Sequence, residues 1–293
     1  CKASDVVIAV FIGTAEVSQF AVALAGVLLL SQFLRTFTAA IKPAISDLDA
    51  RDEHARVREI SFLMQKYTLL LIIPAACFLI VMGKEFLQVW VGDKFPEPHV
   101  LHNLSVILAI LTVGHALQLT QHSNFVVLVG KGQHRLFGVF TAVMALLCVG
   151  ASIASIRLFN LGLVGVAWSN CVPMALMSII ILPAYFNRKM GVSMRESVLR
   201  IWRPAVLGCA PGVIMMIGWK CLSPPTSWLG LSLVVVLAAA LTGLSAWRLS
   251  LTPPERTRLT KILALSRWSA GASAQQKLRE CFPKPQYGQE TKL

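Results

Sequence analysis

The sequence predicts an all-α protein that crosses a membrane many times. Of its 293 residues, 56% are hydrophobic and only 14% are charged, whereas a soluble domain carries roughly 25% charged residues. The mean hydropathy is +0.67, and the apolar residues gather in runs of the length that a spanning helix needs, about 20 residues. The net charge of +13 would suggest nucleic-acid binding in a soluble domain. Here the Lys and Arg residues lie mainly in short breaks between the runs and in the tail, so we expect no nucleic-acid partner.

The first apolar run, residues 5–13, is too short to cross a membrane. The chain also begins with Cys1 rather than Met. We therefore expect the chain to be the C-terminal part of a longer protein, with its first helix beginning upstream. The first complete span is predicted at Val17–Ile45, which is long enough to tilt or to extend beyond the bilayer. The charged stretch 46–60 that follows is predicted to be a surface helix.

Six further apolar runs follow, separated by short breaks that contain charged residues, Gly and Pro. They predict spans at Phe62–Met82, His102–Val129, Leu136–Arg157, Leu161–Phe186, Ile201–Leu222 and Trp228–Leu249. The tail from Thr252 is basic and polar, and we expect a short helix near Glu255–Trp268 followed by a disordered end. The expected domains are a six-helix lobe with a truncated first helix (1–186), two additional spans (187–250) and a cytoplasmic tail (251–293).

Orientation follows from the basic residues, because cytoplasmic loops of membrane proteins carry an excess of Lys and Arg. Of the 27 Lys and Arg residues, 21 fall on one side of the predicted topology, and that side includes the tail. Tryptophans flank the predicted spans at both ends, as in an aromatic belt: Trp90, Trp219 and Trp228 at the outer interface, and Trp202 and Trp247 at the inner one. We therefore expect a cytoplasmic C-terminus.

A polar stripe runs along the second half of the first complete span. Ser31, Arg35, Thr38 and Lys42 are spaced four, three and four residues apart, which places them on one face of a helix. If the span enters the membrane near Gln19, Arg35 lies about 24 Å into a core roughly 30 Å thick. A charge at that depth is expected to face protein or water. The stripe is thus a candidate substrate contact, and the alternative is that Arg35 and Lys42 snorkel to the interface as anchors.

Two further groups of polar residues lie within predicted spans. Thr112, His115, Gln118 and His122 are spaced three, three and four apart on the span His102–Val129. They could line a wet cavity with a protonatable imidazole, or they could form hydrogen bonds between helices. Near the start, Lys2 and Asp5 are three residues apart and could pair as a coupling site or proton relay.

Motifs of catalysis and metal binding are missing from the sequence. It has no HExxH, GxSxG or Walker motif, and Asp5 and the boundary residue Glu16 are the only acids within the predicted spans. The seven cysteines form no CxxC pair and lie mostly in apolar runs, as small apolar residues do. We therefore expect no enzyme activity, no catalytic residue, no metal site and no cofactor.

Several segments together resemble a known family of transporters. They are AIKPAISDLDARDE (40–53), MGKEFLQVWVGDKF (82–95), LVGKGQHRLF (128–137), RLFNLGLVGVAWSNCVPMAL (157–176) and ILPAYFNRKMGVS (181–193). In this order and spacing they resemble the C-terminal half of a bacterial polysaccharide (O-antigen type) flippase of the multidrug/oligosaccharidyl-lipid/polysaccharide exporter superfamily. The resemblance covers residues 5–193, and residues 201–249 fit the two extra helices that many members carry.

The resemblance implies a 12- or 14-helix protein in which two lobes enclose a central cavity. It also implies a function, because family members move undecaprenyl-diphosphate-linked oligosaccharides across the bacterial inner membrane for surface polysaccharide synthesis. The expected partners are the membrane, this lipid-linked oligosaccharide, the missing N-terminal half and the polysaccharide polymerase machinery. Three alternatives remain open: a cation or drug antiporter of the same superfamily, which would favour an acidic cavity, a membrane enzyme of envelope glycan synthesis, and a non-transporting scaffold.

Overall fold

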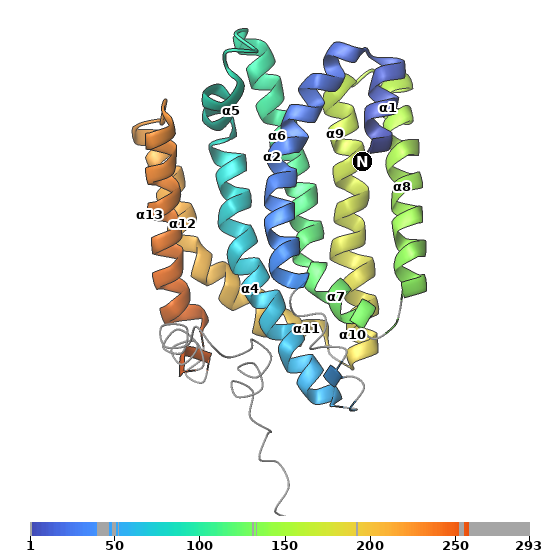
Figure 1. Cartoon of the computed structure of the whole chain (residues 1–293), viewed down its shortest axis with the longest axis vertical. Coiled ribbons are helices and arrows are strands. Elements are labelled where there is room, and N and C mark those ends of the chain that lie inside the picture. The colour runs from blue at the N-terminus through green and yellow to red at the C-terminus, as the bar shows by residue number, and fades with distance from the viewer. Residues whose placement is uncertain are drawn as a thin grey trace, which may run out of the picture. The chain divides into compact units, whose positions relative to one another are not determined.

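The computed structural model describes residues 2–39, 47–48, 51, 53–130, 132, 134–191, 193–251 and 255–257. The chain divides into two compact units, Cys1–Leu249 and Ser250–Leu293. The all-helical class is confirmed, since the structure is 89% helical and its described residues include no strand. The first unit is a bundle of long helices with their axes roughly along one direction (Figure 1).

The helices of this bundle follow one another with short connections. Their bounds are α1 Lys2–Phe11, α2 Thr14–Ala39, α4 His54–Val81, α5 Gly83–Val91, α6 Pro98–Thr120, α7 His122–Gly130, α8 His134–Arg157, α9 Gly162–Leu176, α10 Leu182–Met190, α11 Met194–Ser197, α12 Arg203–Leu222 and α13 Trp228–Ser245. Three π-helical turns continue helices: η1 Met177–Ile181, η2 Val198–Trp202 and η3 Ala246–Ser250.

In the part of the chain that the structure describes, seven segments are long and apolar enough to cross a membrane. They are Thr14–Gln32, Arg56–Val81, Pro98–Val129, Gly138–Arg157, Gly162–Arg188, Met194–Leu222 and Trp228–Ser250. Each overlaps one of the seven spans expected from the sequence. The chain is therefore a multi-pass membrane protein.

Two boundaries differ from the expectation. The first span begins at Thr14, and its predicted end, residues 40–45, lies outside the described residues. The expected surface helix at 46–60 does not stay separate from the next span, because α4 begins at His54 and continues through it without a break. Val57 and Met64 explain this continuity, since both are buried in one cluster with α7 residues such as Val127. The charged residues between 54 and 60 therefore lie in the first turns of a spanning helix.

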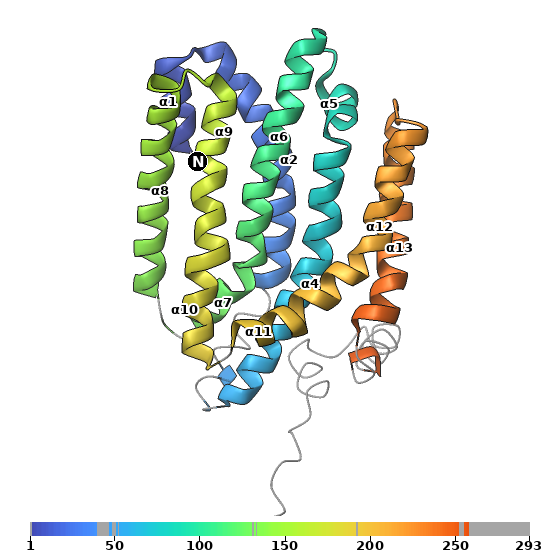
Figure 2. The same cartoon turned by 180° about the vertical axis from the view of Figure 1, so that it is seen from behind.

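The short helix α1 lies beside α8 and α9 along the upper part of the bundle (Figures 1 and 2). The Ser4 hydroxyl donates a hydrogen bond to the Asn170 side-chain carbonyl on α9 over 3.1 Å, and both side chains are buried. At the other end of α1, the Arg157 guanidinium lies 5.0 Å from the centre of the Phe11 ring, a cation–π distance. These contacts hold α1 against its neighbours although it has only ten residues.

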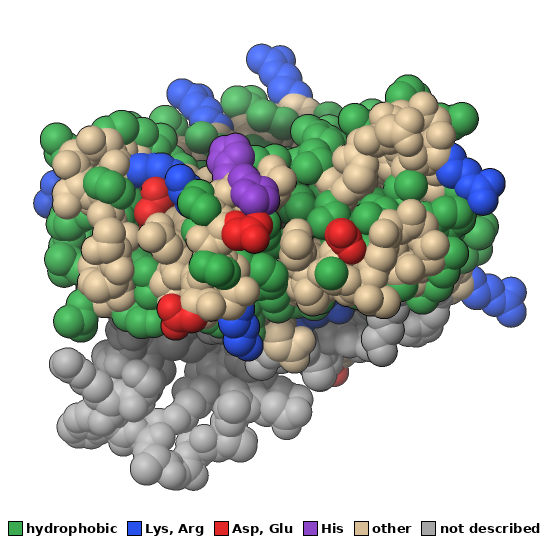
Figure 3. All heavy atoms as spheres, turned by 90° about the horizontal axis from the view of Figure 1, so that it is seen from above, with side chains coloured by type: hydrophobic (Ala, Val, Ile, Leu, Met, Phe, Trp, Pro, Cys, Tyr) green, Lys and Arg blue, Asp and Glu red, His purple; other side chains and the backbone are tan. Residues whose placement is uncertain are grey.

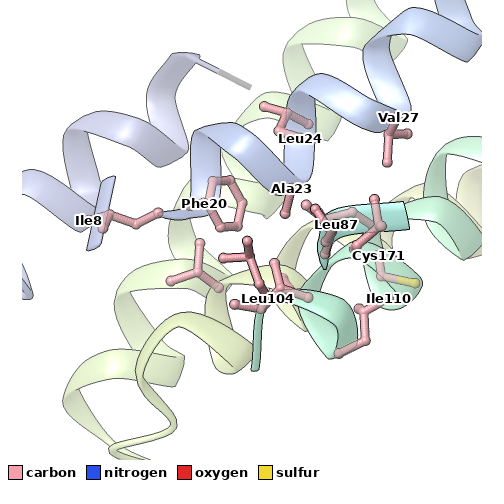
Figure 4. Close-up of a cluster of buried hydrophobic side chains, with 14 of the residues drawn as sticks. Ile8, Phe20, Ala23, Leu24, Val27, Leu87, Leu104, Ile110 and Cys171 are labelled. Carbon is pink, nitrogen blue, oxygen red and sulfur yellow. The ribbon is translucent and has the colours of Figure 1, made fainter. Parts of the chain in front are cut away.

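The largest apolar cluster joins α1, α2, α5, α6 and α9 in the upper part of the bundle. Figure 4 shows Phe20 and Ala23 of α2 facing Leu104 of α6, with Leu87 and Ile8 beside them. One close approach supports this packing. A Cβ on Gly114 of α6 would lie 2.9 Å from the Cα of Cys171 on α9, so only glycine lets the two helices meet here.

The upper end of the bundle carries charges of both signs. Figure 3, seen from above, shows acidic, basic and histidine side chains scattered among hydrophobic ones. One pair at this end is His99 with Glu97, whose nitrogen and oxygen lie 3.1 Å apart on exposed side chains. The opposite end carries the arginines of the 51–58 and 188–203 segments. The charge asymmetry seen in the sequence thus separates the two ends of one bundle.

Candidate functional site

The third membrane segment is broken within the bundle. Helix α6 ends at Thr120 and α7 begins at His122, with Gln121 in a turn between them. The Thr120 hydroxyl donates to the Leu117 carbonyl over 2.7 Å, and the Gln121 N–H donates to the Gln118 carbonyl over 3.1 Å. Such tightened turns end an α-helix. Interrupted helices in membrane transporters line substrate and ion sites, because their freed backbone groups need polar partners.

Arg35 lies on α2, a helix that packs against both parts of the broken span, α6 and α7. The guanidinium side chain is exposed, while the neighbouring Leu34 is buried against α4 and α6. The two polar stripes that the sequence treats separately therefore lie on helices that pack against each other.

The remaining members of the first stripe do not share the environment of Arg35. Ser31 is buried, and its hydroxyl donates to the Val27 carbonyl of its own helix over 3.1 Å. That bond occupies the donor that a substrate hydroxyl would need. Thr38 lies in α2, but its side chain is outside the described residues, as is Lys42 altogether. Their proposed contacts stay predictions.

The second stripe divides into an inner and an outer part. Thr112 is buried and donates to the Leu108 carbonyl over 2.7 Å. His115 is buried, and its Nδ1 lies 3.0 Å from the Leu111 carbonyl, an acceptor that requires the proton on Nδ1. Gln118 is exposed. His122 is half-buried, with its ring 5.8 Å from that of Phe125.

The structure adds polar residues to this region that the sequence analysis missed. Thr68 of α4 and Ser123 of α7 share a hydrogen bond of 2.9 Å between two buried hydroxyls. Nearby in the sequence, Gln65 and Asn124 are also buried, and each has one side-chain amide atom without a hydrogen-bond partner: the nitrogen of Gln65 and the oxygen of Asn124. The run of polar residues from Gln121 to Asn124 was the available sequence signal.

Lys66 is also buried, within the segment Arg56–Val81. It follows Gln65 on α4 and precedes Thr68 by two residues. A buried lysine in a spanning segment faces the interior of a bundle rather than lipid. The basic character of this region is therefore not confined to Arg35.

The third candidate, at the start of the chain, is placed only in part. Asp5 is half-buried on α1, and its Oδ1 atom is buried without a hydrogen-bond partner. The side chain of Lys2 lies outside the described residues, so the predicted Lys2–Asp5 pair stays a prediction. Among the described residues, no group of three His, Cys, Asp or Glu side chains is arranged to hold a metal ion.

The broken span thus carries two imidazoles and several amides and hydroxyls, and α2, which packs against it, carries the Arg35 guanidinium. A guanidinium forms paired, charge-assisted hydrogen bonds with phosphate, and amides and hydroxyls suit the hydroxyl groups of a sugar. The arrangement is therefore chemically suited to an anionic head group that carries many hydroxyls.

Comparison with known proteins gives one match. Residues 2–99 match the model of a family described as polysaccharide biosynthesis protein. Neither the curated proteins nor the solved structures that were compared gave a match. The matched part covers α1, α2, α4 and α5, and so includes Arg35 and its span. Over residues 2–99 the match supports the resemblance seen in the sequence, and the polytopic helical fold is consistent with a flippase-type exporter.

Proposed function

We propose that the chain is part of a flippase that moves undecaprenyl-diphosphate-linked oligosaccharides across the bacterial inner membrane for surface polysaccharide synthesis. The observation that carries the proposal is the exposed Arg35 on α2, a helix that packs against both parts of the broken third span, α6 and α7. The family match on residues 2–99 supports a role in polysaccharide synthesis or export.

The chemistry of the substrate gives a role to a cation near the end of the first spanning segment. A diphosphate that crosses the bilayer must exchange its water shell for fixed donors, and arginine provides them in a planar fork. In this proposal His122 and the exposed amide of Gln118 contact the sugar or the second phosphate. The protein would act without a cofactor and without making or breaking a covalent bond.

The mechanism that fits this fold is alternating access. A six-helix lobe, residues 1–186, would rock against a second lobe supplied by the N-terminal half of the protein, so that the site faces first one leaflet and then the other. In this proposal the basic end of the bundle is cytoplasmic and the C-terminus lies inside. The substrate head group would then meet Arg35 from the cytoplasmic side.

The test replaces Arg35 in the protein expressed in a strain that depends on it for surface glycan. We expect Arg35→Ala and Arg35→Glu to reduce glycan display at least tenfold and to cause lipid-linked intermediates to accumulate, while Arg35→Lys retains part of the activity. Lys84→Ala, a change to an exposed cation on another helix, is the matched control and should have no effect. Normal display by a stably expressed Arg35→Ala variant would show that Arg35 makes no essential phosphate contact.

A further inference from the structure

The sixth membrane segment is longer than a bilayer requires. It runs from Met194 to Leu222, which is 29 residues, and a helix of that length extends about 44 Å, against a hydrocarbon core of roughly 30 Å. The excess lies in its first part, α11 with the π-helical turn η2, residues 194–202. This part runs obliquely across the lower end of the bundle (Figure 2). It therefore belongs at the membrane surface rather than within the hydrocarbon.

Specific contacts hold the start of this segment in place. The Ser197 hydroxyl donates to the Asn187 side-chain carbonyl over 3.2 Å, and the Asn187 amide nitrogen contacts the Met194 sulfur at 2.8 Å. The Glu196 N–H donates to the Ser193 hydroxyl over 3.1 Å, which is a standard N-terminal helix cap. Asn187 itself is buried at the end of α10. These contacts therefore fix the turn between α10 and α11, and with it the direction of the segment.

Apolar side chains cover two sides of the segment. Ile201 is fully buried, in a cluster with Leu69 of α4 and Ala205. Met194 and Val198, four residues apart, are 46% and 52% exposed. Ile201 attaches the segment to the bundle. Met194 and Val198 form an exposed apolar stripe, as in helices that lie in the membrane interface.

Arginines cover the neighbouring side. Arg195 and Arg203 are eight residues apart, a spacing that brings them near one face, and both are exposed. Within the described ranges neither has an ion-pair or hydrogen-bond partner. Arg200 is also exposed, but its guanidinium lies 3.3 Å from the Glu196 carboxylate. Two cations therefore stand beside an exposed apolar stripe, with no acid close enough to neutralise them.

We propose that residues 194–203 form a binding site for anionic phospholipid headgroups, with Arg195 and Arg203 on the phosphate and Met194 and Val198 against the acyl chains. The charge complementarity favours an anionic lipid over a zwitterionic one, because each Lys or Arg near an anionic surface contributes substantially to the attraction. The proposal requires only the multi-pass fold and goes beyond the transported substrate. Bound in this way, the lipid would hold residues 194–202 in place where they lead into α12.

The test measures phospholipid binding to the detergent-purified protein by native mass spectrometry, with phosphatidylglycerol, phosphatidylcholine and inorganic phosphate as probes. We expect the wild-type protein to prefer phosphatidylglycerol, and Arg195→Gln with Arg203→Gln to weaken binding of that lipid roughly tenfold to thirtyfold. The matched control is Lys84→Gln with Lys94→Gln, which removes two exposed lysines elsewhere and should leave the preference unchanged. Arg195→Lys with Arg203→Lys keeps the charge and should keep most of the binding.

Three results would overturn the proposal. Equal losses of phosphatidylglycerol binding in the Arg195→Gln, Arg203→Gln variant and in the Lys84→Gln, Lys94→Gln control would show that only net charge matters. Wild-type binding of phosphatidylglycerol that is no tighter than that of phosphatidylcholine would remove the anionic site. Retention of inorganic phosphate with loss of lipid preference would indicate a site for a soluble anion instead. Thermal unfolding of each variant identifies misfolding. If the Arg195→Gln, Arg203→Gln variant does not fold, the Arg195→Lys, Arg203→Lys variant provides the comparison.

Discussion

Thr68 and Ser123 form a side-chain hydrogen bond between α4 and α7. Both side chains are buried, at 1% and 0% exposure, and their oxygens are 2.9 Å apart. This bond holds α7, which begins after the break at Gln121, against a long neighbouring helix. Loss of one partner would leave a buried hydroxyl unsatisfied.

We predict that a double-mutant cycle with Thr68→Val and Ser123→Ala gives a coupling free energy of about 0.6 kcal/mol and no more than about 1.7 kcal/mol, the range for such bonds within membranes. The measurement is the free energy of unfolding in mixed micelles. Thr112→Val replaces Thr68→Val in the control cycle, because the Thr112 hydroxyl bonds the carbonyl of Leu108 on its own helix. A coupling as large in the control cycle would argue against a direct bond between Thr68 and Ser123.

Single residues also show which features a sequence pattern predicts and which it does not. Helical periodicity groups His115 and His122 with Gln118 on one predicted span. The packing of α2, which carries Arg35, against α6 and α7 is encoded by no single helix. The burial of Lys66 likewise follows from the packing of α4 and not from the apolar run in which it lies. The wet face predicted from Ser31 to Lys42 stays a prediction.

At the scale of helices, α12 and α13 form a closely packed pair. Gly208 and Gly212 are four residues apart on α12, the small-xxx-small spacing of associating membrane helices. The Ser245 hydroxyl of α13 donates to the Gly208 carbonyl, and a Cβ on Gly212 would lie 2.9 Å from the Ala238 carbonyl oxygen. A second contact joins this pair to the rest of the bundle, since the Lys220 ammonium lies 3.4 Å from the Glu85 carboxylate of α5. The two helices are therefore a unit with a defined place beside α4 and α5.

We predict that Gly212→Val destabilises this pair by roughly 1–3 kcal/mol, as overpacking does at a close contact. Gly218→Val is the matched control on the same helix, because nothing lies within 4 Å of a Cβ at that position. The check is thermal unfolding in detergent, together with disulfide cross-linking between cysteines placed on α12 and α13. Equal melting temperatures for the two variants would show that the helices do not approach each other at Gly212.

Helix lengths and order are the part of the fold that the sequence predicts well, because a lipid environment allows few spanning structures and each apolar run has to be a helix. The exact ends are less accessible. Residues 54–60 are charged and read as a surface helix, yet Val57 is buried against α7 and draws those residues into α4. The break at Gln121 was likewise hidden, since residues 102–129 read as one apolar run.

At the scale of the whole molecule, the bundle has two chemically different ends. Lys94, in the connection from α5 to α6, and Arg157, the last residue of α8, lie at one end of the bundle. Arg135 and Arg195 lie at the opposite end, with most of the other arginines. A charge difference of this kind orients a protein during insertion, because translocating Lys and Arg is unfavourable. The difference therefore predicts which end faces the cytoplasm.

We predict that single cysteines at Lys94 and Arg157 react with a membrane-impermeant maleimide in spheroplasts, and that single cysteines at Arg135 and Arg195 react only after the membrane is permeabilised. The background protein has its native cysteines replaced by alanine or serine, which matters most for the exposed Cys221. All four positions are exposed in the structure, so a difference in labelling reports the side of the membrane rather than burial. Labelling of Arg135→Cys in intact spheroplasts, with none at Lys94→Cys, would show that the orientation is the reverse of the predicted one. It would then place the arginines of the 188–203 segment outside, and a diphosphate substrate would have to meet the bundle from the opposite leaflet.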